Sequence, residues 1–534
     1  MTESRARVGE GTPVRSYFPI FLPLRHTDAS TLYQLGLFLG SVGGFLTTLI
    51  SLRAISIGRE FRNITAVDFF VGGTLPIGYW IGLCIIVVTQ ILSFRLKRIR
   101  AFTNIVSSWF LMISMRIVLS IIMSAPFNVD VLYNYAPWIH LWLVGGVQMA
   151  PGTYPYGWPV SFLVGYAITK LGIPVEMFFM WGQIFIYAVE LSTMYYLSQE
   201  IGVGKRAGLM AVFLLAIDSS IYSYNLNYSP QLIGEMLLLL ALYLCIRASR
   251  KPQSRRGLVL AAAYTSILTL THHLSSLYLI FALSGLYLAG RFTRNCVRLP
   301  SFLVSYAVLF WYVSSMFLYP EKMERWGTAL AEVLRRSLVE FPPEFTSVDI
   351  SSFANLIAID KLLFLTYPSL ILALVVGAVL APSRGKGKWY FHIDNSVTII
   401  VGVNGVLMAV LLVGLTFQGL LYPFRMMGLV LILCIPIAAK FLLQLASSLK
   451  GQIVFGVVAS LSVLLGTASI YRLVQRTVPL WEIYPKWRQV EVLSNSPTVT
   501  ALPPVAAYFV VLLLISPLFL QVVSHRGSCL ASRL

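Results

Sequence analysis

Long apolar runs separated by polar loops constrain this chain more than any other feature of its sequence. A helix that crosses the hydrocarbon core of a bilayer takes about 20 mostly apolar residues. Fourteen runs of roughly this kind lie at residues 31–52, 67–92, 101–125, 174–198, 207–222, 230–247, 258–271, 274–290, 300–319, 362–381, 396–416, 424–446, 452–470 and 501–523. The sequence therefore predicts an all-α, polytopic membrane helix bundle of about 14 transmembrane helices.

Composition excludes the other broad classes. Of the 534 residues, 57% are hydrophobic and only 11% are charged, whereas soluble proteins have about 25% charged residues. An outer-membrane barrel would alternate apolar and polar residues along each strand and would lack such continuous runs. No P-loop, dinucleotide-binding glycine motif, Gly-x-Ser-x-Gly elbow or Cys-x-x-Cys pair is present.

The basic residues indicate the orientation of the bundle. Loops on one side, together with both termini, hold 25 of the 40 Lys and Arg residues, the opposite side holds 14, and Arg116 lies inside a run. Under the positive-inside rule both termini are cytoplasmic. Because this topology explains the net charge of +19, we expect a multi-pass protein of the cell membrane with membrane lipids, and no nucleic acid, among its partners. The loop between the first two runs is predicted to be on the outer side but contains Arg53, Arg59 and Arg62, so the first hairpin agrees least well with the positive-inside rule.

The spacing of the runs divides the chain into four parts. These are a cytoplasmic tail at 1–30, a hairpin at 31–100, a core at 101–446, and C-terminal helices with a short tail at 447–534. The core carries two long outer loops, 126–173 and 320–361. The apolar segment 155–171 in the first loop is predicted to be an interfacial helix, because counting it as a span would place later loops on the wrong side for their charge.

The first outer loop contains the most informative acid, Asp130, in SAPFNVDVLYNYAPW just past the third run. Tyr133 and Tyr154 follow in the same aromatic loop. An acid at this position is suited to act as a general base, to bind a cation or to orient a sugar hydroxyl. The alternative is an ordinary solvated loop acid.

A resemblance follows from the order of these features. After Asp130 come Tyr154-Pro155 and Pro159, an apolar helix that ends at Lys170-Leu171-Gly172, a span, and a Gly204–Gly208 turn reading GKRAG. This layout resembles the start of the GT-C glycosyltransferases, which include oligosaccharyltransferase, protein O-mannosyltransferase and aminoarabinose transferase members, over roughly residues 101–446. The resemblance implies a polyprenyl-phosphate-linked sugar donor, a glycan, lipid or protein acceptor, and Asp130 as the base.

The chain departs from that class in its acids. Many members have a second acid beside the first, whereas Asn128 and Val129 precede Asp130 here. In the next outer segment, SYNLNYSPQLIGE, Gln231 takes the expected acidic position and Glu235 lies one turn deeper. Because a divalent cation prefers several carboxylate oxygens, we predict no metal and no other cofactor. Asp218 and Glu235 are candidates for an acceptor or secondary site together with Tyr133 and Tyr154, although Asp218 also suits an exposed helix end.

Three basic or titratable residues are candidates for binding the donor phosphate. His272 and His273 lie at an outward turn in LTLTHHLSSLY, where the alternative is a hydrogen-bonded structural histidine. Adjacent histidines on one helix point to different faces, so they do not form a metal-binding pair. Arg425 stands at the outer start of the run 424–446, where it offers a forked donor to phosphate or marks the interface by snorkelling.

Other residues are assigned structural roles. Arg116 lies inside a span and needs a partner, and Glu190 and Glu235 are the candidates for an ion pair with it. Gly43 and Gly44 are predicted to be helix-packing positions.

These observations favour an inverting membrane glycosyltransferase that acts on the outer face. One alternative is a transporter or flippase of lipid-linked glycans, for which fourteen spans would also be typical but for which we see no internal repeat. An O-antigen ligase or polymerase fits loosely, because loop 320–361 contains no His. The missing second acid also leaves open a non-catalytic relative that keeps only the fold.

Overall fold

The described part of the chain is entirely helical. The structure, a computed structural model, describes residues 29–53, 75–94, 96, 100–118, 135–147, 158–218, 229–250, 254–292, 299–318, 370–377, 399–406, 423–445, 456–457 and 460. Among these residues there is no strand, which confirms the prediction of an all-α chain. Five helices in this part are long and apolar enough to cross a membrane: Ser30–Leu52, Met177–Glu200, Pro230–Arg250, His273–Arg291 and Ser301–Leu318. The total of fourteen spans and the four-part division stay predictions.

In chain order, the helices are α1 (Ala29–Arg53), α3 (Ile77–Ser93), α4 (Ala101–Arg116), α6 (Ala136–Gly145), α8 (Pro159–Lys170), α9 (Val175–Trp181), α10 (Gln183–Glu200), α11 (Lys205–Ala216), α13 (Pro230–Arg250), α14 (Arg255–Thr271), α15 (His273–Phe292), α16 (Ser301–Leu318) and α21 (Pro423–Leu445).

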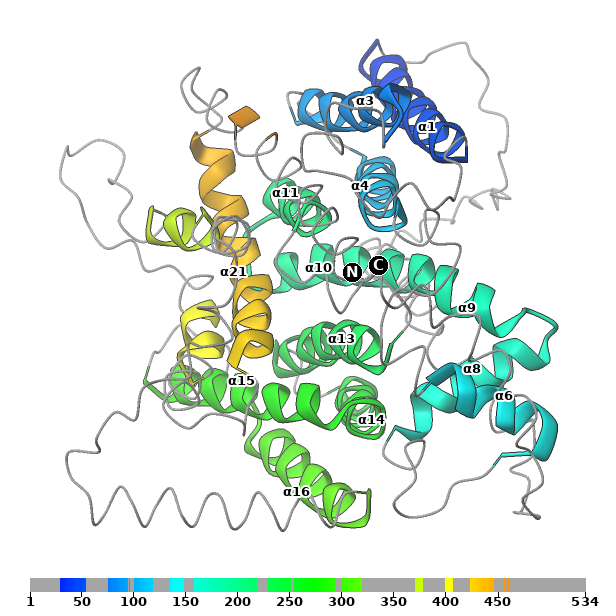
Figure 1. Cartoon of the computed structure of the whole chain (residues 1–534). Coiled ribbons are helices and arrows are strands. Elements are labelled where there is room, and N and C mark those ends of the chain that lie inside the picture. Colours follow the sequence, from blue (N-terminus) through cyan, green and yellow to red (C-terminus); the bar gives the residue numbers. More distant parts are fainter. Residues whose placement is uncertain are drawn as a thin grey trace, which may run out of the picture.

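The bundle is organised around α10 and α13. Helix α10 packs against α4, α11 and α13, and α13 packs in turn against α14 and α15. The α1–α3 hairpin covers α4 at one end of the molecule, α16 lies against α14 and α15 at the other, and α6 and α8 lie together to one side (Figure 1). α13 is the most enclosed of the five apolar helices, with 83% of its apolar window buried inside the protein. Most of α13 is therefore in contact with protein and not with lipid or water.

Helix ends that were predicted to lie on the same side of the membrane are close together. Glu200 at the end of α10 lies 3.8 Å from Arg250 at the end of α13. Near the opposite ends, the Tyr79 hydroxyl of α3 donates a hydrogen bond of 3.3 Å to the Ser114 carbonyl of α4. Helices α10 and α13 therefore run parallel, with α11 between them in the chain, whereas α3 and α4 run antiparallel, and both arrangements agree with the predicted alternation of spans.

Glycines allow α1 and α3 to approach closely. A Cβ atom on Gly82 would lie 2.4 Å from the Gly44 carbonyl oxygen, and one on Gly44 would lie 2.7 Å from the Gly82 oxygen. A Cβ on Gly43 would meet nothing within 4 Å. Of the predicted packing pair, only Gly44 serves in this contact, because a helix turns about 100° per residue and Gly43 faces elsewhere.

Two predicted segments differ in detail from the structure. The run 174–198 contains α9 and α10, which meet at Gly182, and the span Met177–Glu200 continues through both of them. The proposed interfacial segment 155–171 contains α8, whose 12 residues span about 18 Å and are too short to cross the hydrocarbon core. Its predicted end is confirmed, because Lys170 is the last helical residue and Gly172 has a positive φ of 92°. Its place on the outer leaflet stays a prediction.

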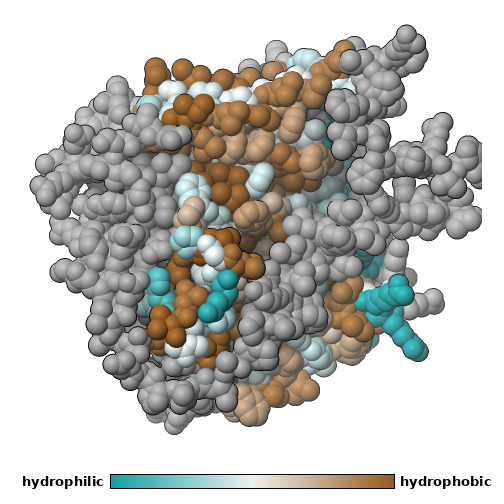
Figure 2. Space-filling model, turned by 90° about the vertical axis from the view of Figure 1, so that its right-hand side faces the viewer, coloured by the Kyte–Doolittle hydropathy of each residue, from teal (hydrophilic) through white to brown (hydrophobic). Residues whose placement is uncertain are grey.

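The described surface is strongly apolar. Ile50 on α1 and Phe317 on α16 each have 71% of their side-chain surface exposed, with many other exposed large hydrophobic residues on the same helices. Figure 2 shows hydrophobic side chains over most of the coloured part of one face, above all at the top, where Figure 1 places α1 and α3. Such a surface is stable against lipid tails and unstable in water, so these helices form part of a membrane protein.

Candidate functional site

A small polar cavity lies where the first turns of α13 meet the link between α14 and α15. We call it the histidine cavity, and its polar lining comes from Gln231, Glu235, His272, Ser275 and Tyr278, with Leu429 of α21 closing one wall. The cavity volume is about 10 Å³, which is close to the smallest volume that holds one water molecule. Two predicted residues, Glu235 and His272, therefore lie in the same cavity although they are far apart in the sequence.

His272 has a clear structural task in this cavity. It is the residue that links α14 to α15, and its Nδ1 atom accepts a hydrogen bond of 3.2 Å from the backbone N–H of Ser275. The Ser275 hydroxyl lies 2.6 Å from the same nitrogen. This is the geometry of an N-cap, in which a side chain satisfies a backbone N–H in the first turn. Since Nδ1 accepts, we infer that the neutral ring carries its proton on Nε2.

Capping predicts how substitutions at His272 change stability. We expect His272→Ala to lower the free energy of unfolding by about 1 kcal/mol, because the first turn of α15 loses its cap. His272→Asn should retain most of the stability, since Asn is a preferred cap residue. Thermal unfolding of the detergent-solubilised proteins measures the difference. Equal losses in the two variants would contradict the capping role.

His273 and Trp158 complete this corner of the bundle. The indole ring of Trp158, one residue before α8, lies 5.0 Å from the imidazole centroids of both His272 and His273. The backbone carbonyl of His273 accepts a hydrogen bond of 3.0 Å from the Trp311 indole of α16. From the sequence, both histidines were predicted at a turn between two apolar runs, where His272 indeed links α14 to α15, but their side chains were expected to point to different faces. In the structure His272 precedes the helix, and both rings contact the same indole.

Glu235 is held in place by its own helix. Its Oε1 atom accepts a hydrogen bond of 3.0 Å from the Gln231 amide, one turn earlier in α13. Helix α13 begins here because Ser229 caps it, accepting a bond of 3.1 Å from the Leu232 N–H, and Pro230 occupies the first helical position. A Cβ on Gly234 would lie 2.6 Å from the His272 Cβ, so this glycine lets the histidine link approach α13.

Arg425 belongs to the helix that closes the cavity. It is the third residue of α21, and Leu429 follows it by one helical turn, which is about 6 Å along the axis. The backbone of Arg425 is therefore close to the wall of the histidine cavity. Three of the predicted residues, His272, Glu235 and Arg425, come from segments that converge on this region.

A second polar group lies beside the cavity and shares Glu235 with it. We call Arg116, Glu190, Asp218 and Glu235 the charged cluster. Arg116, at the end of α4, is 3% exposed, and its guanidinium carbon lies 4.9 Å from the centroid of the Tyr187 ring on α10. Glu190, three residues after Tyr187 on the same face of α10, interacts electrostatically with the other three members. Both sequence-predicted partners of Arg116 thus belong to its surroundings.

Asp218 is buried rather than exposed. It follows α11 and only 1% of its side-chain surface is accessible. The alternative of an exposed acid at a helix end is therefore wrong, and the helices α4, α10 and α21 all pack against α11. Its interaction with Glu190 connects it to the charged cluster.

The remaining predicted residues belong to the first outer loop. Asp130, Tyr133 and Tyr154 lie outside the described residues. Among the residues that the structure does describe, no group of three or more His, Cys, Asp or Glu side chains is arranged to hold a metal ion.

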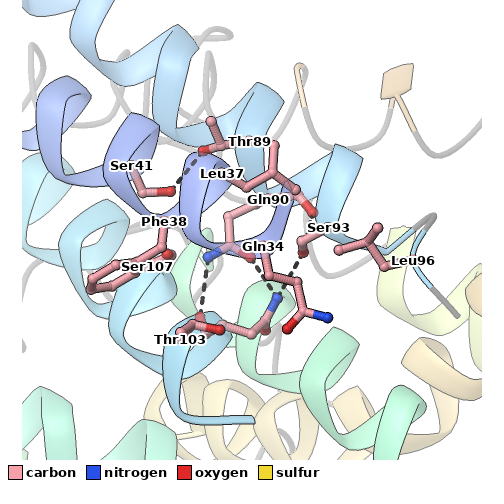
Figure 3. Close-up of a pocket in the computed structure, with 11 residues that line it drawn as sticks. Gln34, Leu37, Phe38, Ser41, Thr89, Gln90, Ser93, Leu96, Thr103 and Ser107 are labelled. Carbon is pink, nitrogen blue, oxygen red and sulfur yellow. Dashed lines mark hydrogen bonds between the residues drawn. The ribbon is translucent and has the colours of Figure 1, made fainter. Parts of the chain in front are cut away.

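A larger polar cavity lies elsewhere, between α1, α3 and α4 (Figure 3). It holds about 20 Å³. The Asn104 amide nitrogen donates to Gln90 Oε1 at 2.9 Å and to the Ser93 hydroxyl at 3.0 Å, while the Gln90 amide donates to the Asn104 carbonyl at 3.1 Å. The lining contains no charged side chain. These bonds join α3 to α4, and we regard the cavity as a helix-packing feature.

The sequence reasoning missed several participants. Tyr187 was not singled out, although its place one turn before Glu190 in a span offered a signal. Trp158 and Ser275 were also missed, because stacking on a histidine and capping by one depend on the backbone path. No family model matches the chain, and no curated protein is significantly similar to it in sequence.

Proposed function

We propose that the chain is an inverting membrane glycosyltransferase that moves a sugar from a polyprenyl-phosphate-linked donor to an acceptor on the outer side. The observation that carries the proposal is the convergence on the histidine cavity of an acid, Glu235, a histidine, His272, and the helix α21, whose first turn contains Arg425. A lipid-linked donor also fits a catalytic chain in which 57% of the residues are hydrophobic.

The roles follow from the chemistry of each group. Arg425 and the Nε2–H of His272 stabilise the negative charge that develops on the departing lipid phosphate. Glu235 accepts hydrogen bonds from sugar or acceptor hydroxyl groups, and Asp218 supports this secondary site. Asp130 accepts the proton of the attacking hydroxyl, and Tyr133 and Tyr154 contact the acceptor.

Donor binding requires the cavity to open. Ligand sites usually enclose several hundred Å³, whereas the histidine cavity holds about 10 Å³. Leu429 is the α21 residue in its wall, so separation of α21 from α13 and α15 is the movement that admits a phosphosugar. The same movement carries the Arg425 backbone, because both residues belong to one helix.

Sugar transfer by purified protein in lipid vesicles tests the proposal. With a labelled polyprenyl-phosphate sugar and a panel of hydroxyl acceptors, we expect Arg425→Gln to lower kcat/KM by about 10- to 100-fold, the loss expected for one charge-assisted hydrogen bond. Lys440→Gln, near the other end of α21, is the matched control and should leave kcat/KM unchanged. Absence of transfer by the unmodified protein with every donor would reject the proposal.

A second candidate is favoured by the charged cluster. Ionisable residues buried within spans are typical of transport pathways, and Arg116 and Glu190 are both buried in helices of the bundle. A transporter of lipid-linked glycans would move a fluorescent carrier lipid across proteoliposome membranes without transferring its sugar. Carrier movement and transfer, measured on the same vesicles, separate the two functions.

A further inference from the structure

The polar cavity between α1, α3 and α4 contains a buried acceptor that its hydrogen-bond network leaves unused. We call it the asparagine cavity, after Asn104, which is part of its lining and is 3% exposed. The Asn104 amide nitrogen donates to Gln90 and Ser93 and so joins α4 to α3. The amide oxygen, Oδ1, is buried and has no hydrogen-bond partner among the described residues. Because a buried acceptor without a donor is unfavourable, the cavity favours a ligand that brings a donor to this atom.

The asparagine cavity accepts only a small group, and it reaches the surface of the bundle. Its volume of about 20 Å³ suits a water molecule or a single hydroxyl group. The Ser41 and Thr89 hydroxyls lie 2.7 Å apart on one side of it (Figure 3). Leu96 and Thr103, also in the lining, are partly exposed. The cavity is therefore accessible near the start of α4.

A group suited to bind phosphate stands at this opening. Arg100 is exposed and directly precedes α4, and its guanidinium Nη2 atom lies 3.5 Å from the Thr31 hydroxyl of α1. The Arg100 carbonyl accepts a hydrogen bond of 2.9 Å from the Thr103 hydroxyl of the cavity lining. Helix α4 has no side-chain cap and no acid in its first turn, so its first N–H groups also face a potential anion. A guanidinium and a helix N-terminus together favour a phosphate group.

The surroundings of the opening indicate a lipid phosphate. Leu35 and Leu39 of α1 and Phe102 of α4 are each more than half exposed, and Figure 2 shows apolar surface where Figure 1 places α1 and α3. The segment 93–100, which joins α3 to α4, reads SFRLKRIR and contains four basic residues and no acid. A basic segment at the end of a membrane helix attracts anionic lipids. The apolar surface beside it suits their acyl chains.

The separation of the two polar features indicates the kind of headgroup. The Asn104 N–H donates to the Arg100 carbonyl, so Asn104 lies one helical turn, about 6 Å, beyond Arg100. A glycerol group attached to a phosphate can bridge such a distance and ends in a hydroxyl group. That hydroxyl is small enough for the asparagine cavity and supplies the donor that Asn104 Oδ1 needs.

We propose that the asparagine cavity is a binding site for an anionic phospholipid of the phosphatidylglycerol kind, whose headgroup carries a free hydroxyl. Arg100 and the start of α4 bind the phosphate, a headgroup hydroxyl donates a hydrogen bond to Asn104 Oδ1, and the acyl chains cover Leu35 and Leu39. The site adjoins the predicted cytoplasmic tail 1–30 and shares no lining residue with the histidine cavity. The proposal goes beyond sugar transfer and does not depend on it.

Native mass spectrometry of the purified full-length chain in a neutral detergent tests the site by its lipid selectivity. Phosphatidylethanol is the matched control lipid, because it has the same charge as phosphatidylglycerol but no headgroup hydroxyl. We expect phosphatidylglycerol to bind with a Kd lower by about two- to tenfold, the net contribution of one hydrogen bond. Equal Kd values for the two lipids would overturn the proposal. This comparison uses the unmodified protein and so does not depend on a variant that folds.

Two further ligands test the charge and the lipid nature of the ligand. Phosphatidylcholine has no net charge and should bind about fivefold more weakly than phosphatidylglycerol, whereas equal binding would overturn the role of the phosphate charge. Glycerol phosphate has the same headgroup chemistry without acyl chains. We expect it not to displace phosphatidylglycerol at equal concentration, because it leaves the apolar surface of α1 uncovered. Displacement by glycerol phosphate would overturn the assignment to a lipid.

Two variants assign the headgroup to its residues. Arg100→Gln should weaken phosphatidylglycerol binding by about fivefold, the effect of one basic residue close to an anionic lipid. Arg255→Gln is the matched control and should leave binding unchanged, because Arg255 is an exposed arginine at the start of α14. Asn104→Leu should remove the preference for phosphatidylglycerol over phosphatidylethanol. Unchanged binding in a folded Arg100→Gln protein, or a preference that persists in a folded Asn104→Leu protein, would contradict the site.

Discussion

Replacing Asp130 by Asn is expected to lower kcat for sugar transfer by about 100- to 10,000-fold, the range typical of a positioned general base. The amide retains the size and hydrogen-bonding capacity of the acid but cannot accept the acceptor's proton. Donor binding should change little, because the phosphate is assigned to Arg425 and His272. The measurement is kcat and donor KM in the vesicle assay.

A control acid distinguishes this effect from a general loss of outer-loop charge. Asp349→Asn changes an acid of the outer loop 320–361 by the same chemistry and should leave kcat unchanged. If Asp130→Asn keeps the turnover of the unmodified protein, the assignment of the base is wrong. If kcat falls equally in both variants, the effect comes from the loss of negative charge in the outer loops.

Replacing Arg116 by Met is expected to lower the free energy of unfolding by about 3–5 kcal/mol, the usual cost of removing one partner of a buried charged group. Met has a similar length but no charge, so Glu190, Asp218 and Glu235 lose the cation of the charged cluster. The stacking contact with Tyr187 at 4.9 Å is lost as well. Arg116→Lys keeps the positive charge, so its free energy of unfolding should fall by less than that of Arg116→Met.

The exposed ion pair at the opposite end of the bundle supplies the control. Arg250 lies 3.8 Å from Glu200, and the two side chains are 41% and 24% exposed. Arg250→Met should therefore cost about 1 kcal/mol or less. Unfolding of the reconstituted proteins by titration with a denaturing detergent measures both variants. Equal losses would show that burial gives Arg116 no special importance.

How far the sequence predicted the fold depended on whether each signal was local. The run 230–247 became α13 (Pro230–Arg250), and the run 274–290 became α15 (His273–Phe292), because length and apolar content alone decide such spans. The boundary between α9 and α10 at Gly182 was missed, since one glycine in an apolar run carries little signal. The Gly204–Gly208 motif was predicted as a turn, yet only Gly204 precedes α11 and Lys205 already begins it.

In the candidate site, too, local sequence signals were predicted correctly, whereas features that depend on the tertiary structure were missed. The need of Arg116 for Glu190 or Glu235 followed from the cost of a lone charge in a span, and both acids interact within the charged cluster. The cap that His272 provides to α15 could not be predicted, because it depends on the backbone conformation at one residue. The burial of Asp218 was missed for a related reason: exposure depends on which helices cover a helix end.

The sequence by itself determined that this chain is an all-α membrane protein, since hydrophobic run length and charge density are properties of local segments and need no knowledge of their neighbours. Only the tertiary structure decided which polar residues meet. Glu235 of α13 lines one cavity with His272 and also interacts with Glu190 of α10, because the packing of α13 against both neighbours brings together residues that lie far apart in the sequence.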